Sequence, residues 1–128
     1  MNETEWELQR LTGTVLSCAF RVSNTLGSGF LEKVYENALA MELREKGMRV
    51  LQQANVDVLY RDRVVGQYVS DLIVDQSVVV EVKATSSLQS SHEAQCMNYL
   101  KATRLKVCLL LNFGRPKIEY RRIIWSRC

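Results

Sequence analysis

Apolar side chains recur every three or four positions in the first part of the chain, which is the spacing of one face of an α-helix. The first such stretch occupies about residues 4–25 and begins with Thr4-x-x-Glu7, the spacing of a capping box. A glycine-rich break at residues 27–29 ends it, and a second stretch follows over about residues 31–46. The pattern therefore predicts two helices before any strand.

After the second helix the apolar period changes from about four to two. Residues 50–60 and 64–74 are rich in β-branched and aromatic side chains, with a polar turn at residues 61–63 between them. A third strand is expected over residues 77–83. Because residues 78–80 are three consecutive valines, this strand is expected to be buried on both faces in the middle of a sheet.

The last quarter of the chain predicts one helix and two more strands. Ser90-x-x-Glu93 is a second capping-box spacing, and it opens a helix that extends to about residue 102. Strands are expected over residues 105–112 and 118–125.

The predicted order is therefore α-α-β-β-β-α-β-β. A helix between the third and fourth strands implies a right-handed crossover, and hence a mixed sheet with helices packed on it, an α/β fold. The chain shows no repeat and no linker. We expect one domain over residues 1–128.

The amino-acid composition agrees with a single domain and favours the cytoplasm as the cellular location. A chain of 128 residues with 47% apolar side chains can bury a sufficient core by itself. The longest uncharged run, residues 11–20, is about half of the ~20 apolar residues that a membrane span requires. Four cysteines without a Cys-x-x-Cys pair, and a single histidine, do not favour a zinc or iron–sulfur site. We expect a cytoplasmic protein without membrane association, in which Cys18, Cys96 and Cys108 are core residues and Cys128 is a terminal thiol.

The net charge of +3 conceals an uneven distribution. Residues 1–100 carry 9 basic and 13 acidic side chains, whereas residues 101–128 carry 8 basic side chains against Glu119 alone. These cations are either phosphate contacts or solvated charges on an edge hairpin. They are Lys101, Arg104, Lys106, Arg115, Lys117, Arg121, Arg122 and Arg127.

Three charged residues interrupt the apolar second and third strands. Glu81 and Lys83 are two positions apart, so they share one face of their strand. Asp71 joins that face if the hairpin has a three-residue loop, 75–77, which places Asp71 opposite Glu81. A two-residue loop would turn Asp71 away, unless a bulge restored the geometry.

Two carboxylates within ~5 Å repel by about 3 kcal/mol at an effective dielectric constant near 20, so a positive charge between them is expected. Oxygen ligands without a histidine cluster suit Mg²⁺ or Mn²⁺, which keep several waters and need only one or two protein carboxylates. Lys83 could then orient a water or stabilise charge on a phosphate. The alternative is a structural ion pair between Lys83 and Asp71 or Glu81.

Asp71 followed on the next strand by Val80-Glu81-Val82-Lys83 resembles the PD-(D/E)XK nuclease superfamily, with Ser70 where the superfamily name has a proline. The restriction-endonuclease-like core of that superfamily has the element order predicted above. Further segments resemble the GxxExxY proteins, a small bacterial and archaeal group within it. They are Gly29-x-x-Glu32-x-x-Tyr35, His92-Glu93-Ala94-Gln95, Asn98-Tyr99-Leu100 and Leu111-Asn112-Phe113-Gly114.

The resemblance implies roles for the matching residues. Asp71 and Glu81 would bind the metal, together with Glu32 on the second helix and the backbone carbonyl of Val82. Lys83 would be the catalytic lysine. Glu36 shares a face with Glu32, so both glutamates or only one could point toward the sheet, and Glu36 otherwise reads as a solvated helix charge.

Other matching residues would act on the substrate side. Gln95 and Tyr99 resemble the glutamine and tyrosine pair of the exonuclease-type branch: Gln95 could position a metal-bound water or phosphate, and Tyr99 could hold the strand backbone. His92 lies in the first turn of the last helix, where amides favour an anion, although a histidine there is commonly incidental. Arg121 and Arg122 would bind phosphates. Phe113, Tyr120 and Trp125 are core residues or stacking platforms.

The function implied is metal-dependent hydrolysis of phosphodiester bonds in nucleic acid, with DNA favoured. The alternative is a nucleic-acid-binding or partner-binding module on the same fold without turnover. A chain this short has few additions for gripping a duplex, so a homodimer or a subunit of a larger assembly is also expected.

Overall fold

The computed structural model describes residues 2–126 and contains three helices and five strands in that range. They are α1 (Glu3–Leu26), α2 (Glu32–Glu45), β1 (Val50–Tyr60), β2 (Arg63–Val74), β3 (Val78–Lys83), α3 (Ser90–Thr103), β4 (Val107–Asn112) and β5 (Glu119–Ile124). The order matches the sequence prediction. Arg127 and Cys128 lie outside the described residues.

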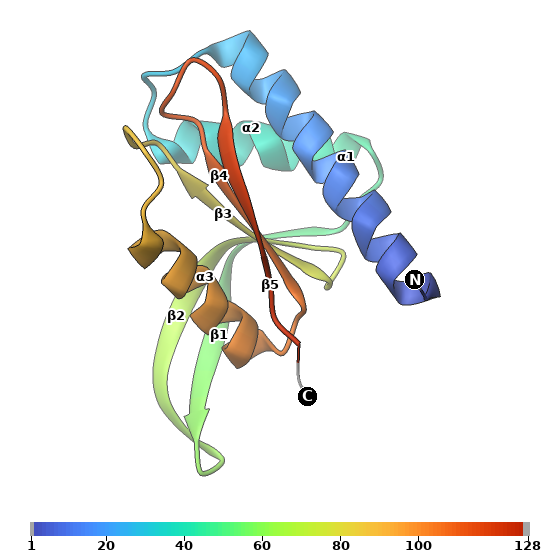
Figure 1. Cartoon of the computed structure of the whole chain (residues 1–128), viewed down its shortest axis with the longest axis vertical. Coiled ribbons are helices and arrows are strands. Elements are labelled where there is room, and N and C mark those ends of the chain that lie inside the picture. Colours follow the sequence, from blue (N-terminus) through green and yellow to red (C-terminus); the bar gives the residue numbers. More distant parts are fainter. Residues whose placement is uncertain (1, 127–128) are drawn as a thin grey trace.

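The five strands form one mixed sheet in the order β1-β2-β3-β4-β5 (Figure 1). Strand β3 pairs in parallel with β4, and the other neighbours pair antiparallel. Helix α3 is the crossover between the two parallel strands, as predicted. Strand β3 is the central strand, and Val78, Val79 and Val80 are fully buried, which confirms the expectation from the valine run.

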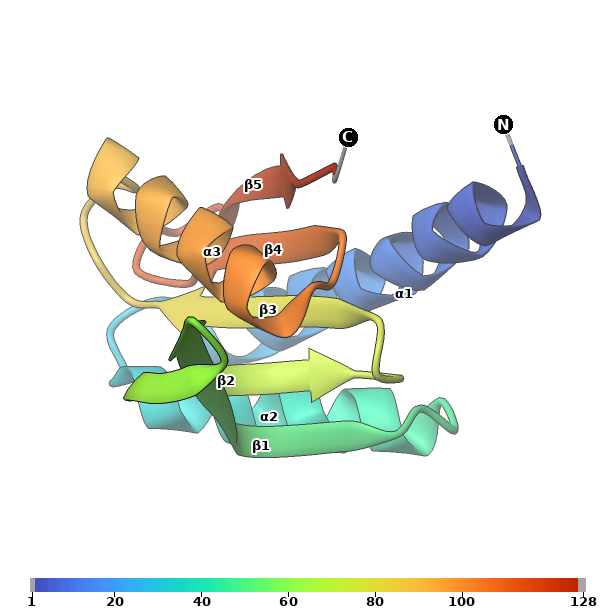
Figure 2. The ribbon, with the colours of Figure 1, turned by 90° about the horizontal axis from the view of Figure 1, so that it is seen from below.

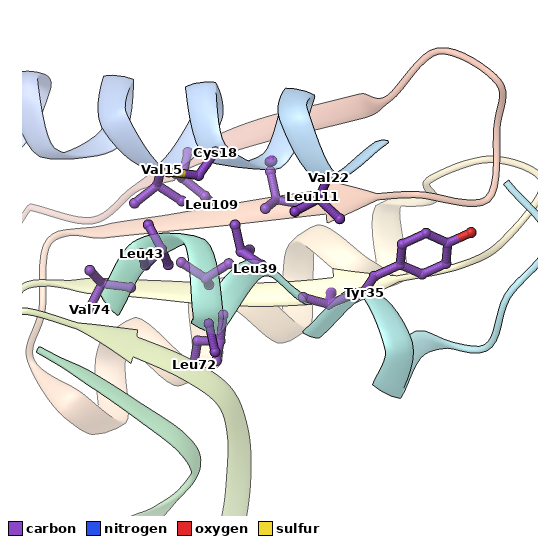
Figure 3. Packing of buried hydrophobic residues seen from close by; sticks show 14 of the residues in the cluster. Val15, Cys18, Val22, Tyr35, Leu39, Leu43, Leu72, Val74, Leu109 and Leu111 are labelled. Atoms are coloured by element: carbon purple, nitrogen blue, oxygen red, sulfur yellow. The ribbon is translucent and has the colours of Figure 1, made fainter. Parts of the chain in front are cut away.

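Helices cover both faces of the sheet (Figure 2). Helices α1 and α2 lie on one face and α3 lies on the other. The larger core is under α1 and α2, where Leu39 and Leu43 pack against Leu72, Leu109 and their neighbours (Figure 3). A second core lies under α3. It contains Cys96 and Cys108, and the larger core contains Cys18, so all three cysteines are core residues as predicted.

Strands β1 and β2 form a long hairpin that projects beyond the rest of the sheet (Figure 1). Tyr60 pairs with Arg63, so the connecting turn has two residues, not the three that the sequence suggested. Arg61 and Asp62 both have positive φ, 52° and 63°, as the tight two-residue turns that suit twisted hairpins require.

Both helices are capped by residues other than those of the predicted capping boxes. The side chain that caps α1 is Asn2, which accepts a hydrogen bond from the backbone N–H of Glu5. Helix α3 is capped by Gln89, whose partner in the capping box is His92. In each case a residue just before the expected Thr or Ser takes the cap, because the helix begins earlier than the sequence pattern indicates.

Tyr35 fastens the connection between α1 and α2. Its hydroxyl donates to the backbone carbonyl of Gly27 at 2.6 Å and accepts from the N–H of Phe30 at 3.1 Å. Its ring stacks on Phe113, which follows β4, with the centroids 4.8 Å apart. The start of α2 is therefore held against the loop between β4 and β5. Within residues 2–126, no helix has the length and apolar character needed to cross a membrane.

Candidate metal and phosphodiester site

The connection between β2 and β3 has three residues, 75–77, because Val74 pairs with Val78. This is the loop length that places Asp71 on the same face as Glu81. The paired residues of the two strands end at Leu72 and Val80. Beyond that point the side chain of Asp71 replaces the backbone as the hydrogen-bond acceptor, because its Oδ2 accepts a hydrogen bond from the backbone N–H of Val82 at 2.8 Å. The strands therefore separate at Asp71 and Glu81.

Gln53 lies opposite the point where β2 leaves β3. Its backbone has a positive φ of 52°, and it is skipped in the pairing of β1 with β2, so this strand carries a local irregularity. Its side-chain amide donates to Glu36 Oε1 at 2.7 Å and to Asp71 Oδ1 at 3.4 Å. Gln53 thus connects the carboxylate of Asp71 with helix α2.

Glu81 is the most unusual group of the site. The residue is only 3% exposed, and its Oε1 has no hydrogen-bond partner among the described residues. Burial, followed by repulsion from Asp71, raises the pKa of Glu81 to about 9, and the hydrogen bond shared with Asp71 acts in the same direction. A buried oxygen without a partner is costly and is rare in folded proteins. Burial and the neighbouring Asp71 therefore favour the protonated, neutral form of the Glu81 carboxyl in the protein alone.

Lys83 does not neutralise Glu81 or Asp71 through an ion pair. Its Nζ donates to Oε1 of Gln95 on α3 at 3.3 Å. Among residues 2–126 the ion pairs within 4.0 Å are Lys33–Glu36 and Arg121–Glu119, so the structural ion pair considered for Lys83 is not formed. The ammonium of Lys83 is instead engaged by a neutral partner on α3.

The two glutamates of α2 have different surroundings. Glu32, the first residue of the helix, is exposed and lines a pocket of about 450 Å³ together with Asp71 and Gln53. Glu36 also reaches this pocket but is only 3% exposed, and it accepts hydrogen bonds from Gln52 and Gln53 at 2.8 and 2.7 Å. The interpretation of Glu36 as a solvated charge was therefore wrong.

On α3, Tyr99 and His92 make contacts within the protein. The Tyr99 hydroxyl donates to the backbone carbonyl of Val69 on β2 at 3.1 Å, the strand contact that the sequence suggested. Burial and the nearby Glu81 and Asp71 raise the pKa of Tyr99 to about 12, so it remains a donor. His92 Nδ1 accepts the backbone N–H of Gln89 at 3.0 Å, which gives this histidine a capping role.

The two arginines of β5 do not join the carboxylates. Arg122 donates to the Thr12 hydroxyl on α1 at 2.7 Å, on the sheet face opposite α3. Arg121 pairs with Glu119 at 3.5 Å. Of the C-terminal aromatics, Phe113 is buried, Trp125 is partly buried against the second core, and Tyr120 is exposed with its ring edge-on to Phe20.

The residues present fit a hard divalent cation that retains much of its water. No group of three or more His, Cys, Asp and Glu side chains within residues 2–126 is arranged as a complete metal site. However, the unpartnered oxygen of Glu81 lies beside Asp71, and Asp71 borders the pocket that contains Glu32. Magnesium typically takes only one or two protein carboxylates, so two acids and an open pocket are the donor set it uses.

Helices on both faces of a mixed sheet, with acids and a lysine where two strands separate, define a nuclease-like fold. A family model described as the PD-(D/E)XK nuclease superfamily matches residues 9–123. The chain belongs to this superfamily.

Two solved structures have a similar fold. The protein called SSO0001 aligns with a TM-score of 0.57 and 16% identity over 75% of this chain and 50% of its own, so this chain spans half of its length. An alkaline exonuclease from Laribacter hongkongensis aligns with a TM-score of 0.50 and 13% identity over 84% of this chain and 76% of its own. No curated protein matches the sequence.

Sequence reasoning missed Gln53 and the burial of Glu36. Gln53 belongs to a strand in which polar residues alternate with apolar ones, so it reads as an ordinary outward-facing side chain. Only its positive φ and the separation of β2 from β3 bring its amide between Asp71 and Glu36. The available signal for Glu36 was its helical face, which it shares with Glu32 and Tyr35.

Proposed function

We propose that the chain is a metal-dependent nuclease that hydrolyses phosphodiester bonds in nucleic acid, with DNA as the favoured substrate. The observation that carries this proposal is the buried Oε1 of Glu81, which has no hydrogen-bond partner among the described residues and lies near Asp71. Lys83, two positions after Glu81 on the same strand, donates its hydrogen bond to Gln95 and not to either acid. A purely structural cluster would neutralise the acids with the lysine. This site keeps the lysine and the acids apart, which favours a role for each of them in chemistry.

Asp71, Glu81, the Val82 carbonyl and Glu32 are the groups that would hold the cation, Mg²⁺ or Mn²⁺. When bound, such an ion lowers the pKa of a coordinated water and stabilises negative charge on a phosphate. Asp71 is oriented for this role, because the N–H of Val82 holds its Oδ2 and Gln53 contacts its Oδ1. Glu81 must release its proton before it can serve as a ligand, since the pKa of its carboxyl is about 9 in the protein alone.

Lys83 supplies the positive charge that the chain itself brings to the reaction. Its ammonium would orient the attacking water or stabilise the charge that develops on the phosphate. Gln95 limits the positions that the flexible lysine can occupy, so that less ordering is required when the substrate binds. Gln95 therefore acts on the reaction through Lys83.

Around this centre, His92, Tyr99, Arg121 and Arg122 remain proposed contacts for the substrate. For Tyr99 and His92 the hydrogen bonds seen here favour a positioning role, in which they fix β2 and the start of α3. The segment Gly29-x-x-Glu32-x-x-Tyr35 supports placement of the chain in the GxxExxY group. A cytoplasmic location and a homodimer, or a place in a larger assembly, are part of the same proposal.

Degradation assays test this function directly. Supercoiled plasmid, linear duplex and single-stranded DNA would be incubated with the protein and Mg²⁺ or Mn²⁺, beside Glu81→Gln and Lys83→Met. Glu45→Gln and Lys46→Met, both on the exposed end of α2, are matched controls. We expect the control variants to degrade DNA like the parent chain and the two site variants to lose at least about a hundredfold in rate.

Equal degradation by all five proteins would show that the activity comes from a contaminant or from another site. Binding of DNA without any metal-dependent degradation would instead support the alternative, a binding module on this fold. Calorimetric titration with Mn²⁺ then shows whether the acids hold metal at all.

A further inference from the structure

A groove lies between α3 and the projecting hairpin of β1 and β2. Its volume is about 810 Å³, and one of its sides is a continuous stripe of α3 that begins near His92 and Gln95. Asn98 and Lys101 continue this stripe toward the C-terminal end of the helix, where Arg104 follows. Gln95, which lines the groove, accepts the hydrogen bond from Lys83, so this end of the groove lies one side chain away from the proposed catalytic lysine.

The opposite side of the groove is apolar and aromatic. Val58 and Leu59 come from β1 and Tyr68 comes from β2. Tyr68 is 56% exposed, and its ring stands edge-on to Tyr99, with centroids 6.1 Å apart and planes at 88°. Tyr99 is buried and tied to the backbone of Val69, so the platform on which Tyr68 stands is fixed. An exposed tyrosine with a fixed base can stack on a planar ligand at low entropic cost.

Cations gather at the other end of the groove. Arg104 is exposed, and within residues 2–126 no hydrogen bond or ion pair engages its guanidinium group. Its backbone has a φ of 64°, the left-handed conformation at the end of α3 in which glycine is the usual residue. A bulky, charged residue is thus kept at a position where its backbone is strained, which points to a use for the side chain. Lys101 lies one turn earlier on the same helix.

We propose that this groove binds a single strand of nucleic acid, with a base stacked on Tyr68 and the phosphates near Lys101 and Arg104. The inference rests on the proposed nuclease function and adds the strandedness of the substrate. Bases in a duplex are stacked on one another, so an aromatic side chain in a groove can reach them only when they are unpaired. From Gln95 to Arg104 the helix extends ~14 Å, which accommodates a few nucleotides leading to Lys83.

Binding measured without metal tests the groove separately from catalysis. Fluorescence anisotropy would compare a labelled oligothymidylate with a labelled duplex of the same length, in EDTA and at several salt concentrations. We expect tighter binding of the single strand. We also expect Tyr68→Leu to weaken it about tenfold, within the range for loss of one base stack. Arg104→Gly should weaken binding of the single strand. It should also make the binding constant less dependent on salt concentration, by the amount expected for the loss of about one phosphate contact.

Matched controls exclude a general loss of structure. Trp6 on α1 is also an exposed aromatic, at 61%, so Trp6→Leu removes an aromatic side chain outside the groove. Arg21→Gln removes an exposed arginine from α1. Both controls should bind the oligonucleotide like the parent chain. Because glycine relieves the backbone at position 104, Arg104→Gly should melt at a higher temperature than the parent while it binds more weakly.

The inference is overturned if the duplex binds more tightly than the single strand, or if the groove variants and the control variants behave alike. It is also overturned if Tyr68→Leu abolishes a dimer in sedimentation analysis, because the groove would then be an interface between copies. Loss of DNA degradation in Glu81→Gln with unchanged single-strand binding would support both proposals. If none of the proteins degrades DNA but the groove variants still lose binding, the groove stands and the nuclease proposal fails.

Discussion

The side-chain oxygen Oδ2 of Asp71 lies 2.8 Å from the backbone nitrogen of Val82, eleven residues further along the chain. A side chain thereby satisfies a backbone donor at the position where the paired residues of β2 and β3 end. The same carboxylate is a proposed metal ligand, so the site is oriented by the backbone of the central strand. Removing the charge and removing the acceptor should therefore have separable effects.

Asp71→Asn should keep most of the stability and lose metal binding. An asparagine retains one oxygen that can accept the N–H of Val82, but it brings no negative charge to the cation. We expect the affinity for Mn²⁺ to fall by roughly tenfold or more. Asp71→Ala should in addition lower the free energy of unfolding by about 1–3 kcal/mol, because the Val82 N–H loses its partner. Calorimetric titration and urea unfolding measure the two effects. A similar stability loss in both variants would contradict this role.

Without metal, the protein should become less stable as the pH rises. The pKa of Glu81 is about 9 in the folded chain and near the ordinary glutamate value of 4.5 when the chain is unfolded, so between these pH values the folded state holds one proton more. The free energy of unfolding then falls with rising pH, by at most about 1.4 kcal/mol per pH unit. The stabilisation is complete below about pH 4.5 and is lost as the pH passes through about 9.

Glu81→Gln should remove this slope, because glutamine does not titrate. Urea unfolding in EDTA between about pH 5 and pH 8 would compare the variant with the parent chain. Glu45→Gln, at the exposed end of α2, is the control and should leave the slope unchanged. Parallel pH profiles for parent and Glu81→Gln would assign the slope to another group.

Gln95→Leu should slow hydrolysis without unfolding the protein. Leucine cannot accept the hydrogen bond from Lys83, so the ammonium would sample more positions. We expect kcat to fall roughly 10- to 100-fold, as for other supporting contacts at catalytic groups, with little change in KM. Gln95→Glu retains an acceptor and should recover part of kcat, with an altered pH profile. An unchanged kcat in Gln95→Leu would remove Gln95 from the mechanism.

The two glutamates of α2 should separate into one that serves metal binding and one that serves stability. Glu32 is exposed, so Glu32→Gln should lower Mn²⁺ affinity while the free energy of unfolding stays within about 0.5 kcal/mol. Glu36 is buried and accepts two side-chain amides, so Glu36→Gln places an amide donor against them and should destabilise by about 1–3 kcal/mol. Calorimetry and urea unfolding of both variants would reveal a reversed assignment.

Gly114→Ala should disturb the segment that follows Lys83. A Cβ at position 114 would lie 2.3 Å from the backbone oxygen of Thr85 and 2.4 Å from its nitrogen, so one loop must move. We expect a loss of about 1–3 kcal/mol together with reduced activity. Gly13→Ala is the control: nothing lies within 4 Å of its Cβ, and alanine in a helix should stabilise by up to about 1 kcal/mol. Equal melting temperatures for Gly114→Ala and the parent would contradict the close approach.

Alternation of side chains reduced the relation between Asp71 and Glu81 to two arrangements, on the same face of the sheet or on opposite faces. Because residues two apart share a strand face, the length of one loop decided between two arrangements, and Val74 opposite Val78 gave the arrangement that joins them. The central position of β3 followed equally well from three consecutive valines. These features depend on local periodicity, which the sequence carries directly.

Features that depend on the meeting of separate segments could not be predicted in this way. The amide of Gln53 reaches Asp71 and Glu36 only because β1 is irregular there and α2 packs over the same point. His92 had a suitable position for an anion, but the preceding backbone N–H of Gln89 uses its Nδ1. For Gln53 tertiary packing selected the partners, whereas the His92 contact is a local cap three residues away, which the sequence pattern did not distinguish from an anion site.

The attachment of Tyr35 to Gly27, Phe30 and Phe113 divides the segment Gly29-x-x-Glu32-x-x-Tyr35 into two kinds of position. The tyrosine belongs to the architecture, whereas Glu32 is exposed and lines the pocket with Asp71. If Glu32 binds the proposed metal, a substitution at this position would change the chemistry of the site and leave the junction of α1, α2 and the β4–β5 loop in place.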